Sequence, residues 1–378
     1  MQKHFRSDLI AGSNGVANSQ EFAKNLGANG AAGGLNSLNG GADFVNSSVS
    51  RREFITNSAK LGAGLAILGS VSLFASKANA AANNGAKIAA AMPTLTLNNG
   101  VKMPVAGFGT LKLGDAKTTQ KLVEQALEAG YRLFDTAQSY ANEEAVGAAF
   151  AATGVPRSEL FITCKLFRPY ANEALAGKAY FESLKKLRID YADLYLIHQP
   201  VNDTYGAYRA MTRLYKDKAV RAIGVSNFDP ARVMDFAQNH EVVPAVNQIE
   251  CHPYYQQTFA QENLKSLGIQ MEAFSPLRQA RDGILQDKTL VQIAKKHGKS
   301  VGQVILRWVY QRGIVSVVKT TKPARMAENL AIFDFTLSGD DMKKIAALDG
   351  AKPKLLDHQD PQRIKWFNER VAGESLKR

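Results

Sequence analysis

The chain has 378 residues, of which 45% are hydrophobic and 21% are charged, and its formal net charge is +13. This length allows one large or two ordinary domains, and the composition is typical of a soluble globular protein. No run of about 18 strongly apolar residues predicts a membrane-spanning helix. The basic residues are scattered and no nucleic-acid-binding motif accompanies them, so we expect no nucleic-acid partner.

The first eighty residues resemble an export address. Residues 1–50 are rich in Gly, Ala, Asn and Ser, a composition that cannot bury enough surface to fold. Arg51-Arg52 then precede a weakly apolar stretch over residues 61–75 and the small-residue triplet Ala78-Asn79-Ala80. A charged start, a short apolar segment and an A-x-A site are typical of a secretory signal. The paired arginines, followed by Phe-Ile, resemble the twin-arginine (Tat) consensus.

We therefore expect a disordered leader with a twin-arginine signal over residues 1–80 and a linker over residues 81–92. The Tat export machinery would then be a partner, and the mature protein would be periplasmic or exported. The alternative is a disordered tail with a chance Arg-Arg pair on a cytoplasmic protein.

The remainder, residues 93–378, begins with a hairpin signal and continues with a regular alternation of strands and helices. Residues 95–110 alternate apolar and polar side chains around Asn98-Asn99-Gly100, which predicts a β-hairpin. Short β-branched runs then alternate with amphipathic stretches. The predicted strands are Ala106–Thr110, Arg132–Ala137, Leu160–Leu166, Asp193–Gln199, Ala222–Asn227, Ala245–Glu250, Met271–Ser275 and Ile314–Lys319.

Helices are predicted between these strands. In Thr118–Ala129 the apolar residues share one face and Gly130 ends the helix, whereas Asn142 is the predicted N-cap of a helix that runs to Phe150. Eight strand–helix units over about 250 residues predict the α/β class and a (β/α)8 TIM barrel, with an N-terminal β-hairpin and a C-terminal tail. A doubly wound sheet would show a glycine-rich phosphate loop, which Gly107-Phe108-Gly109 does not complete.

Four ionisable residues follow the ends of three successive predicted strands: Asp135, Tyr140, Lys165 and His198. In a (β/α)8 barrel such residues point into the active-site face. A tyrosine with an ordinary pKa near 10 donates its proton poorly, and we expect the ammonium of Lys165 to lower that pKa while Asp135 holds Lys165. His198 could donate a hydrogen bond to a substrate oxygen. The set predicts a general acid beside an electrophilic pocket.

Each of these residues also has an ordinary structural interpretation. Asp135 could cap a loop, Tyr140 could pack at the barrel mouth, Lys165 could be solvated and His198 could bond a backbone carbonyl. Their convergence on adjacent strand ends favours chemistry instead. The six histidines show no metal-ligand spacing and no G-x-S-x-G motif occurs, so redox chemistry with an external hydride source is favoured over hydrolysis.

At these residues the chain resembles the aldo-keto reductases. The motifs GFGT, FDTAQSYANEEAVG, DLYLIHQP, GVSNF and NQIECHPY match that family in order and spacing, and the resemblance covers residues 94–370. It implies a barrel whose hairpin plugs the bottom, and NADP(H) extended across the top without a Rossmann loop. It also implies that Tyr140 is the proton donor and that Asp135, Lys165 and His198 assist it.

The resemblance further implies a set of cofactor contacts. The nicotinamide carboxamide would be held by Ser226, Asn227 and Gln248, and the ring would stack on Phe274, where the family usually has Tyr. Ser275 and Leu277 would approach the pyrophosphate. The segment VVKTTKPARMAENL resembles the adenosine-phosphate site; there the 2′-phosphate would bind Lys319, Thr320 and Arg325, and the adenine would meet Glu328 and Asn329. We therefore expect NADPH in preference to NADH.

Candidate substrate walls are Phe167, Tyr170, Gln199 and Trp366, and the polar Gln199 would suit a hydroxylated substrate. The tail LLDHQDPQRIKWF resembles microbial reductases of the 2,5-diketogluconate type, which act on sugar-derived ketones and small aldehydes. We expect a monomeric NADPH-dependent reductase of a small carbonyl substrate. The alternative is a non-catalytic NADP(H)-binding regulatory module on the same fold.

Overall fold

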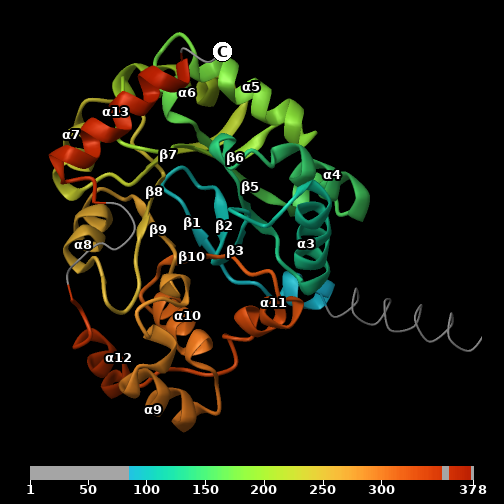
Figure 1. The fold of residues 1–378 in the computed structure, drawn as a ribbon, viewed down its shortest axis with the longest axis vertical. Coiled ribbons are helices and arrows are strands. Elements are labelled where there is room, and N and C mark those ends of the chain that lie inside the picture. Colours follow the sequence, from blue (N-terminus) through green and yellow to red (C-terminus); the bar gives the residue numbers. More distant parts are fainter. Residues whose placement is uncertain (1–84, 351–356, 376–378) are drawn as a thin grey trace, which may run out of the picture. The chain divides into compact units, whose positions relative to one another are not determined.

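A closed barrel of eight parallel strands forms the centre of the protein. The computed structural model describes residues 85–350 and 357–375. The strands follow one another around the barrel in the order β10-β3-β4-β5-β6-β7-β8-β9 (Figure 1). They are β3 (Ala106–Gly109), β4 (Leu133–Asp135), β5 (Phe161–Leu166), β6 (Ala192–Ile197), β7 (Val220–Ser226), β8 (Val246–Glu250), β9 (Gln270–Phe274) and β10 (Val315–Val318). All eight predicted strands and the predicted (β/α)8 barrel are confirmed.

Helices surround the strands (Figure 1). The α-helices are α3 (Ala116–Ala129), α4 (Glu143–Thr153), α5 (Ala176–Leu187), α6 (Thr204–Lys216), α7 (Pro230–Gln238), α8 (Thr258–Ser266), α9 (Lys288–His297), α10 (Val301–Gln311), α11 (Pro323–Leu330), α12 (Gly339–Ala346) and α13 (Pro361–Ser375). Short 3-10 helices are η2 (Gln138–Tyr140), η3 (Arg157–Glu159), η4 (Arg168–Tyr170), η5 (Arg278–Ala280) and η6 (Ile284–Gln286).

The structure confirms the predicted end of α3 but changes the predicted role of Asn142 at the start of α4. Gly130 ends α3 with φ 107°, a left-handed conformation that favours glycine, as predicted. Asn142 precedes α4 as predicted, but its side chain makes no capping hydrogen bond. Its Nδ2 instead donates to the main-chain oxygen of Thr110, at 2.8 Å, so the side chain ties the start of α4 to the end of β3.

The predicted hairpin closes the N-terminal end of the barrel. Strands β1 (Thr94–Thr96) and β2 (Lys102–Pro104) pair antiparallel. Leu97 and Met103 pack with apolar residues from the early parts of the barrel strands, such as Leu133 and Val246. The side-chain amide of Asn98 donates to the main-chain oxygen of Pro244, at 3.1 Å, just before β8. The plug expected from the family resemblance is therefore present.

Side-chain alternation explains why the functional residues meet inside the barrel. Successive residues of a strand point to opposite faces. Leu133, Phe161, Leu194 and Leu196 belong to the interior cluster, whereas the residues between them pack outward against the helices. Asp135, Lys165 and His198 continue the same inward positions toward the C-terminal ends of β4, β5 and β6. The interior thus changes from apolar near the hairpin to polar at the opposite end.

Part of the predicted linker is helical in the structure. The predicted leader and twin-arginine signal, residues 1–80, lie outside the described residues. Residues 85–90 form a helix, and Ile88 and Met92 are partly buried against the core that packs between barrel and helices. These apolar residues give the segment a surface to bury. In the described part of the chain, each helix is too short or too polar to cross a membrane.

Candidate active site

A cavity of about 850 Å³ opens at the C-terminal ends of the barrel strands. Three of the four predicted catalytic residues line it, and Lys165 lies directly behind them. The predicted cofactor-binding residues also line this cavity: Ser226, Asn227, Gln248, Phe274, Ser275, Leu277, Lys319, Thr320, Arg325, Glu328 and Asn329. One continuous space therefore connects the proton-transfer cluster to the basic segment that follows β10.

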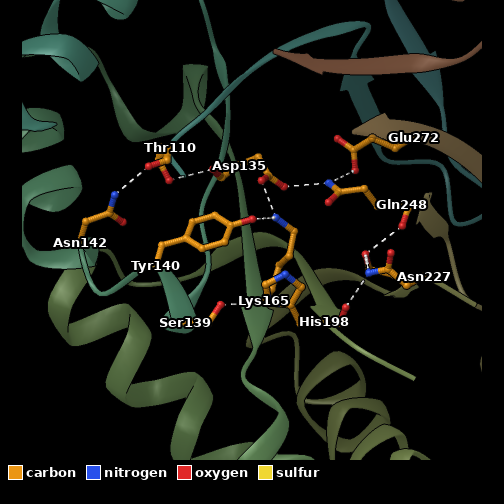
Figure 2. A network of polar contacts seen from close by, with 11 residues as sticks. Thr110, Asp135, Ser139, Tyr140, Asn142, Lys165, His198, Asn227, Gln248 and Glu272 are labelled. Atoms are coloured by element: carbon orange, nitrogen blue, oxygen red, sulfur yellow. Dashed lines mark hydrogen bonds and ion pairs between the residues drawn. The ribbon is translucent and has the colours of Figure 1, made fainter. Parts of the chain in front are cut away.

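A buried ion pair lies at the base of the cavity (Figure 2). The ammonium of Lys165 donates to Asp135 Oδ1 and, at 3.1 Å, to the hydroxyl oxygen of Tyr140. Lys165 is fully buried and Asp135 is 4% exposed. Charges of both signs are costly to bury unless they are paired and hydrogen bonded. Here the carboxylate of Asp135 offsets the cost of burying the Lys165 ammonium. The ammonium in turn stays in contact with the Tyr140 hydroxyl.

The pKa of Tyr140 is raised above its usual range, which corrects the lowered value expected from the sequence. Burial of the phenol is the largest cause, and the charge of Asp135 acts in the same direction; Lys165 lowers the pKa, but by less than burial raises it. Tyr140 is therefore a protonated phenol at neutral pH. Lys165 is positioned to stabilise the phenolate that forms when the proton leaves.

Two side chains fix the loop that carries Tyr140. Gln138 donates from Nε2 to the main-chain oxygen of Ala179, at 2.9 Å, and accepts at Oε1 from the main-chain N–H of Phe167, also at 2.9 Å. At the other end of the loop, Asn142 bonds Thr110 as described above. These contacts tie the loop to three elements, β3, β5 and α5, and hold the phenol over Lys165.

His198 is a neutral imidazole beside Tyr140. Burial, followed by the charges of Lys165 and Arg168, holds its pKa well below its usual range. The rings of His198 and Tyr140 meet edge to face with centroids 5.7 Å apart. His198 Nδ1 lies 3.3 Å from Ser139 Oγ. When the Ser139 hydroxyl donates to Nδ1, the proton of the neutral ring lies on Nε2. That N–H can donate to a carbonyl oxygen.

The predicted carboxamide-binding residues form a connected group on β7 and β8 (Figure 2). Ser226 Oγ donates to the main-chain oxygen of Gln248, at 2.8 Å. Asn227 Nδ2 donates to Ser226 Oγ and to the main-chain oxygen of His198, both at 3.0 Å. Asn227 adopts φ 67°, a left-handed conformation that asparagine tolerates better than most residues. This backbone bend turns the chain away at the end of β7, beside the cavity.

Glu272 is a buried residue of this site that the sequence analysis missed. Its carboxyl accepts from Gln248 Nε2 at 2.8 Å, and the same nitrogen lies 2.8 Å from Asp135 Oδ2. Burial and then the charge of Asp135 raise the pKa of Glu272 to about 8. The signal was present as a lone acid inside the apolar run of the predicted strand Met271–Ser275, between inward-pointing Gln270 and Phe274.

The basic end of the cavity contains more cations than predicted. Lys319 and Arg325 line it as expected, and Lys322 and Lys112 line it as well. The first three are exposed at the end of β10 and the start of α11, so their charges face any ligand that enters. Asn329, predicted to meet adenine, already hydrogen bonds Tyr131 through its side chain.

The predicted substrate walls divide into two groups. Gln199 lines the cavity, and its Oε1 lies 2.6 Å from Nε2 of His358 in the tail. Phe167, Tyr170 and Trp366 are not among the residues that line the cavity, and Trp366 is 38% exposed. Leu111, which the sequence analysis did not name, lines the cavity after β3 and is 41% exposed.

The tail is held against the mouth of the barrel by aromatic contacts. The ring of His358 stacks on Phe367 at 5.6 Å, and Phe367 is 3% exposed. The guanidinium of Arg168 lies 5.7 Å from the Phe367 ring, which joins α13 to η4. Phe367 is therefore a buried aromatic residue that anchors the tail.

Comparisons with known proteins agree with this geometry. The profile of the Aldo/keto reductase family matches residues 106–350. The chain is 46% identical over 257 residues to the glyoxal reductase of Bacillus subtilis (strain 168), an alignment that covers 68% of this chain and 92% of the relative. It is 41% identical over 266 residues to a methylglyoxal reductase of Salmonella typhimurium, covering 69% and 96%.

A solved structure extends the comparison to the cofactor. The aldo-keto reductase of Bombyx mori in complex with NADP superposes with a TM-score of 0.68 at 34% sequence identity, covering 72% of this chain and 97% of that one. The chain therefore belongs to the aldo/keto reductase family, an oxidoreductase family that uses NADP(H). The amide and hydroxyl side chains at one end of the cavity and the cations at the other fit such a dinucleotide.

Among the described residues, no group of three or more His, Cys, Asp or Glu side chains is arranged to hold a metal ion. The two cysteines, Cys164 and Cys251, are free and buried.

The raised pKa of Glu272 predicts a pH-dependent stability. Relative to a usual carboxyl pKa of 4.5, the folded protein keeps this proton up to about pH 8. The folded state thus binds more protons than the unfolded state across this window, so the free energy of unfolding falls as the pH rises and levels off above about pH 8. Glu272→Gln removes this titration. In urea unfolding, its stability relative to wild type should rise from acidic pH to about pH 8.

The matched control is Glu182→Gln, an exposed acid on α5. Because its carboxyl stays in solvent, the stability difference from wild type should not grow with pH. If the difference in unfolding free energy between Glu272→Gln and wild type is also independent of pH, Glu272 is not an ionisable carboxyl held neutral by burial.

Proposed function

We propose that this protein is an NADPH-dependent reductase that converts a small aldehyde or ketone to an alcohol, with Tyr140 as the proton donor. The observation that carries the proposal is the contact between the buried ammonium of Lys165 and the Tyr140 hydroxyl, at 3.1 Å, in a cavity that His198 also lines. A non-catalytic dinucleotide-binding module would not require a charged lysine buried against a phenol.

The residues have distinct roles in this reaction. When bound, NADPH supplies the hydride that reduces the carbonyl carbon. His198 donates a hydrogen bond to the carbonyl oxygen and orients it between imidazole and phenol. Tyr140 gives its proton to that oxygen as negative charge develops there, which completes the alcohol. The resulting phenolate is stabilised by Lys165, and Asp135 keeps the lysine charged and in place until solvent returns the proton.

Two observations support a small, oxygenated substrate. The relatives named glyoxal reductase and methylglyoxal reductase align over more than nine-tenths of their own length. The tail resembles that of 2,5-diketogluconate reductases, and its His358 contacts Gln199 at the cavity. We therefore place small dicarbonyls and sugar-derived ketones first among candidate substrates. Phe167, Tyr170 and Trp366 remain predicted contributors to specificity.

Tyr140→Phe tests the role of the proton donor. Loss of a positioned general acid typically costs about 100-fold or more in rate, so kcat/KM for methylglyoxal should fall by at least ~100-fold. The dissociation constant for NADPH should change by less than ~3-fold, because Tyr140 bonds Lys165 rather than a carboxamide-binding residue. The measurement is NADPH oxidation at 340 nm across a carbonyl panel, with NADPH binding followed by fluorescence.

Tyr310→Phe is the matched control, since Tyr310 lies on α10 outside the residues that line the cavity. It should reduce carbonyls at the wild-type rate. Equal rates for wild type and Tyr140→Phe would overturn the assignment of the acid. A wild type that binds NADPH but reduces no carbonyl in the panel would favour the regulatory-module alternative.

We also propose that the protein is exported by the twin-arginine route. The supporting pattern is Arg51-Arg52, the apolar stretch over residues 61–75 and the Ala78-Asn79-Ala80 triplet. NADPH is made in the cytoplasm and the twin-arginine route moves folded proteins. We therefore infer that NADP(H) leaves the cell already bound in the cavity, or that the enzyme acts before export.

Replacement of both arginines by lysine should keep the full-length protein in the cytoplasm, because the export receptor reads the arginine pair. The measurement is immunoblotting of cytoplasmic and periplasmic fractions for wild type and Arg51→Lys/Arg52→Lys, with nucleotide absorbance on the purified periplasmic protein. Full-length wild-type protein found in the cytoplasm would count against export. Replacement of Lys60 by arginine, which leaves the pair intact, should not change the fractionation.

A further inference from the structure

We propose that Glu272 is a positioning residue that, together with Asp135, locks the side-chain amide of Gln248 with its oxygen toward the cofactor cavity. This proposal rests on the proposed use of a nicotinamide cofactor in this cavity. The hydrogen bonds that connect Glu272 to the proton donor Tyr140 run through Gln248, Asp135 and Lys165. Gln248 is the one of these residues that Glu272 bonds directly, so we expect its effect on the cofactor to pass through Gln248.

The orientation of the Gln248 amide is fixed by what surrounds its nitrogen. Nε2 lies 2.8 Å from Asp135 Oδ2 and 2.8 Å from Glu272 Oε2, as Figure 2 shows. An amide nitrogen carries two hydrogens, and an amide oxygen in its place would face the lone pairs of an ionised Asp135. Asp135 therefore excludes the flipped amide. Glu272 takes the second hydrogen and stops the amide from turning about its bond to Asp135.

As a result, the Gln248 side chain presents only a hydrogen-bond acceptor, its Oε1, to the cavity. Gln248 lines the cavity, and among the described residues no hydrogen bond engages its Oε1. Nearby, Asn227 uses Nδ2 to donate to Ser226 Oγ and to the His198 main-chain oxygen, which leaves Oδ1 as its acceptor. A primary carboxamide has two N–H groups, so acceptor oxygens in fixed positions select one orientation of that group.

The free-energy cost of burying the Glu272 carboxyl indicates that this side chain has a role beyond packing. The side chain is fully buried in β9, and its Oε1 has no hydrogen-bond partner among the described residues. A buried polar atom without a partner costs free energy, whereas a leucine at this position would have no such cost. The acid offers what leucine cannot, namely an acceptor for the second hydrogen of Gln248.

The neighbouring groups distinguish this role from proton transfer. The charged and titratable groups that act on Glu272 are Asp135 on β4 and Lys165 on β5, and Glu272 in turn acts on Tyr140 through space. Its strand partners are Gln248 on β8 and Val315 on β10, neither of which titrates. Only Gln248 accepts or donates a hydrogen bond at the Glu272 carboxyl in the described part of the chain.

The test compares two ligands that differ only at the carboxamide. NADP⁺ carries an amide N–H₂, and its 3-acetylpyridine analogue carries a methyl group at that position. Loss of one hydrogen bond is worth about 3- to 10-fold in affinity, so wild type should bind NADP⁺ about 3- to 10-fold more tightly than the analogue. Dissociation constants are measured by titration calorimetry on the purified full chain.

Two variants then separate positioning from packing. Glu272→Gln keeps an acceptor oxygen for Gln248 and should preserve the wild-type ratio of the two dissociation constants. Glu272→Leu has a similar volume but no acceptor, so Gln248 is held by Asp135 alone. Its amide can then turn about that single hydrogen bond, and the ratio of the two dissociation constants should fall to about 1 or 2. If the leucine variant does not fold, Glu272→Met supplies an unbranched apolar side chain for the same measurement.

A wild-type ratio retained by Glu272→Leu or Glu272→Met would overturn the proposal, as would a wild type that binds the two ligands equally. Failure of the proposed function has a different signature. If the protein binds NADP⁺ and the analogue with the expected ratio of dissociation constants but reduces no carbonyl, the role of Glu272 is supported and the proposed reductase activity is wrong. The carbonyl assay and the ligand ratio therefore report the two claims separately.

Discussion

The ion pair between Lys165 and Asp135 is the contact on which the rest of the site depends. Both charges are buried inside the barrel, and desolvation makes such a pair costly unless each member keeps good partners. Asp135 accepts from Lys165 at one oxygen and from Gln248 at the other, while Lys165 also donates to Tyr140. The pair thus organises the proton donor on one side and the amide that faces the cofactor on the other.

This arrangement explains how a phenol with a raised pKa can serve as an acid. Burial disfavours the phenolate in the resting protein, so Tyr140 keeps its proton, and the adjacent ammonium offsets part of that cost. The stabilisation by Lys165 is largest when negative charge appears on the phenol oxygen. An interaction that strengthens as the reaction proceeds lowers the barrier more than one that stabilises the starting state. His198, held neutral, can donate a hydrogen bond without adding a second positive charge.

Much of the fold and the catalytic cluster could be predicted because both follow from short-range patterns. The eight strands are short runs rich in apolar residues between amphipathic helices, and Asp135, Lys165 and His198 follow the inward positions of three of them. The direction of the Tyr140 pKa could not be predicted, because the contribution of burial depends on side chains from several strands. Glu272 was missed for a related reason, since a single acid in a strand shows its importance only when Gln248 and Asp135 are placed beside it.

The contacts of the C-terminal tail were harder to predict from the sequence than those of the barrel. The position of Trp366 depends on how α13 docks on η4, and no local periodicity specifies that contact. The structure shows a stacked contact between His358 and the buried Phe367, two residues that the sequence did not single out. Long-range packing of this kind is set by shape and by a few aromatic contacts, which a linear pattern does not reveal.

Chemical rescue of Lys165→Ala tests the central claim most directly, namely that the ammonium beside Tyr140 enables proton donation. The truncation leaves a space where the buried lysine side chain was, and a small primary amine such as ethylamine can supply an ammonium there. We expect Lys165→Ala to reduce methylglyoxal at least ~100-fold more slowly than wild type and ethylamine to restore part of the rate. We also expect no such recovery for Tyr140→Phe. A Lys165→Ala enzyme that reduces the carbonyl at the wild-type rate without amine would contradict the account.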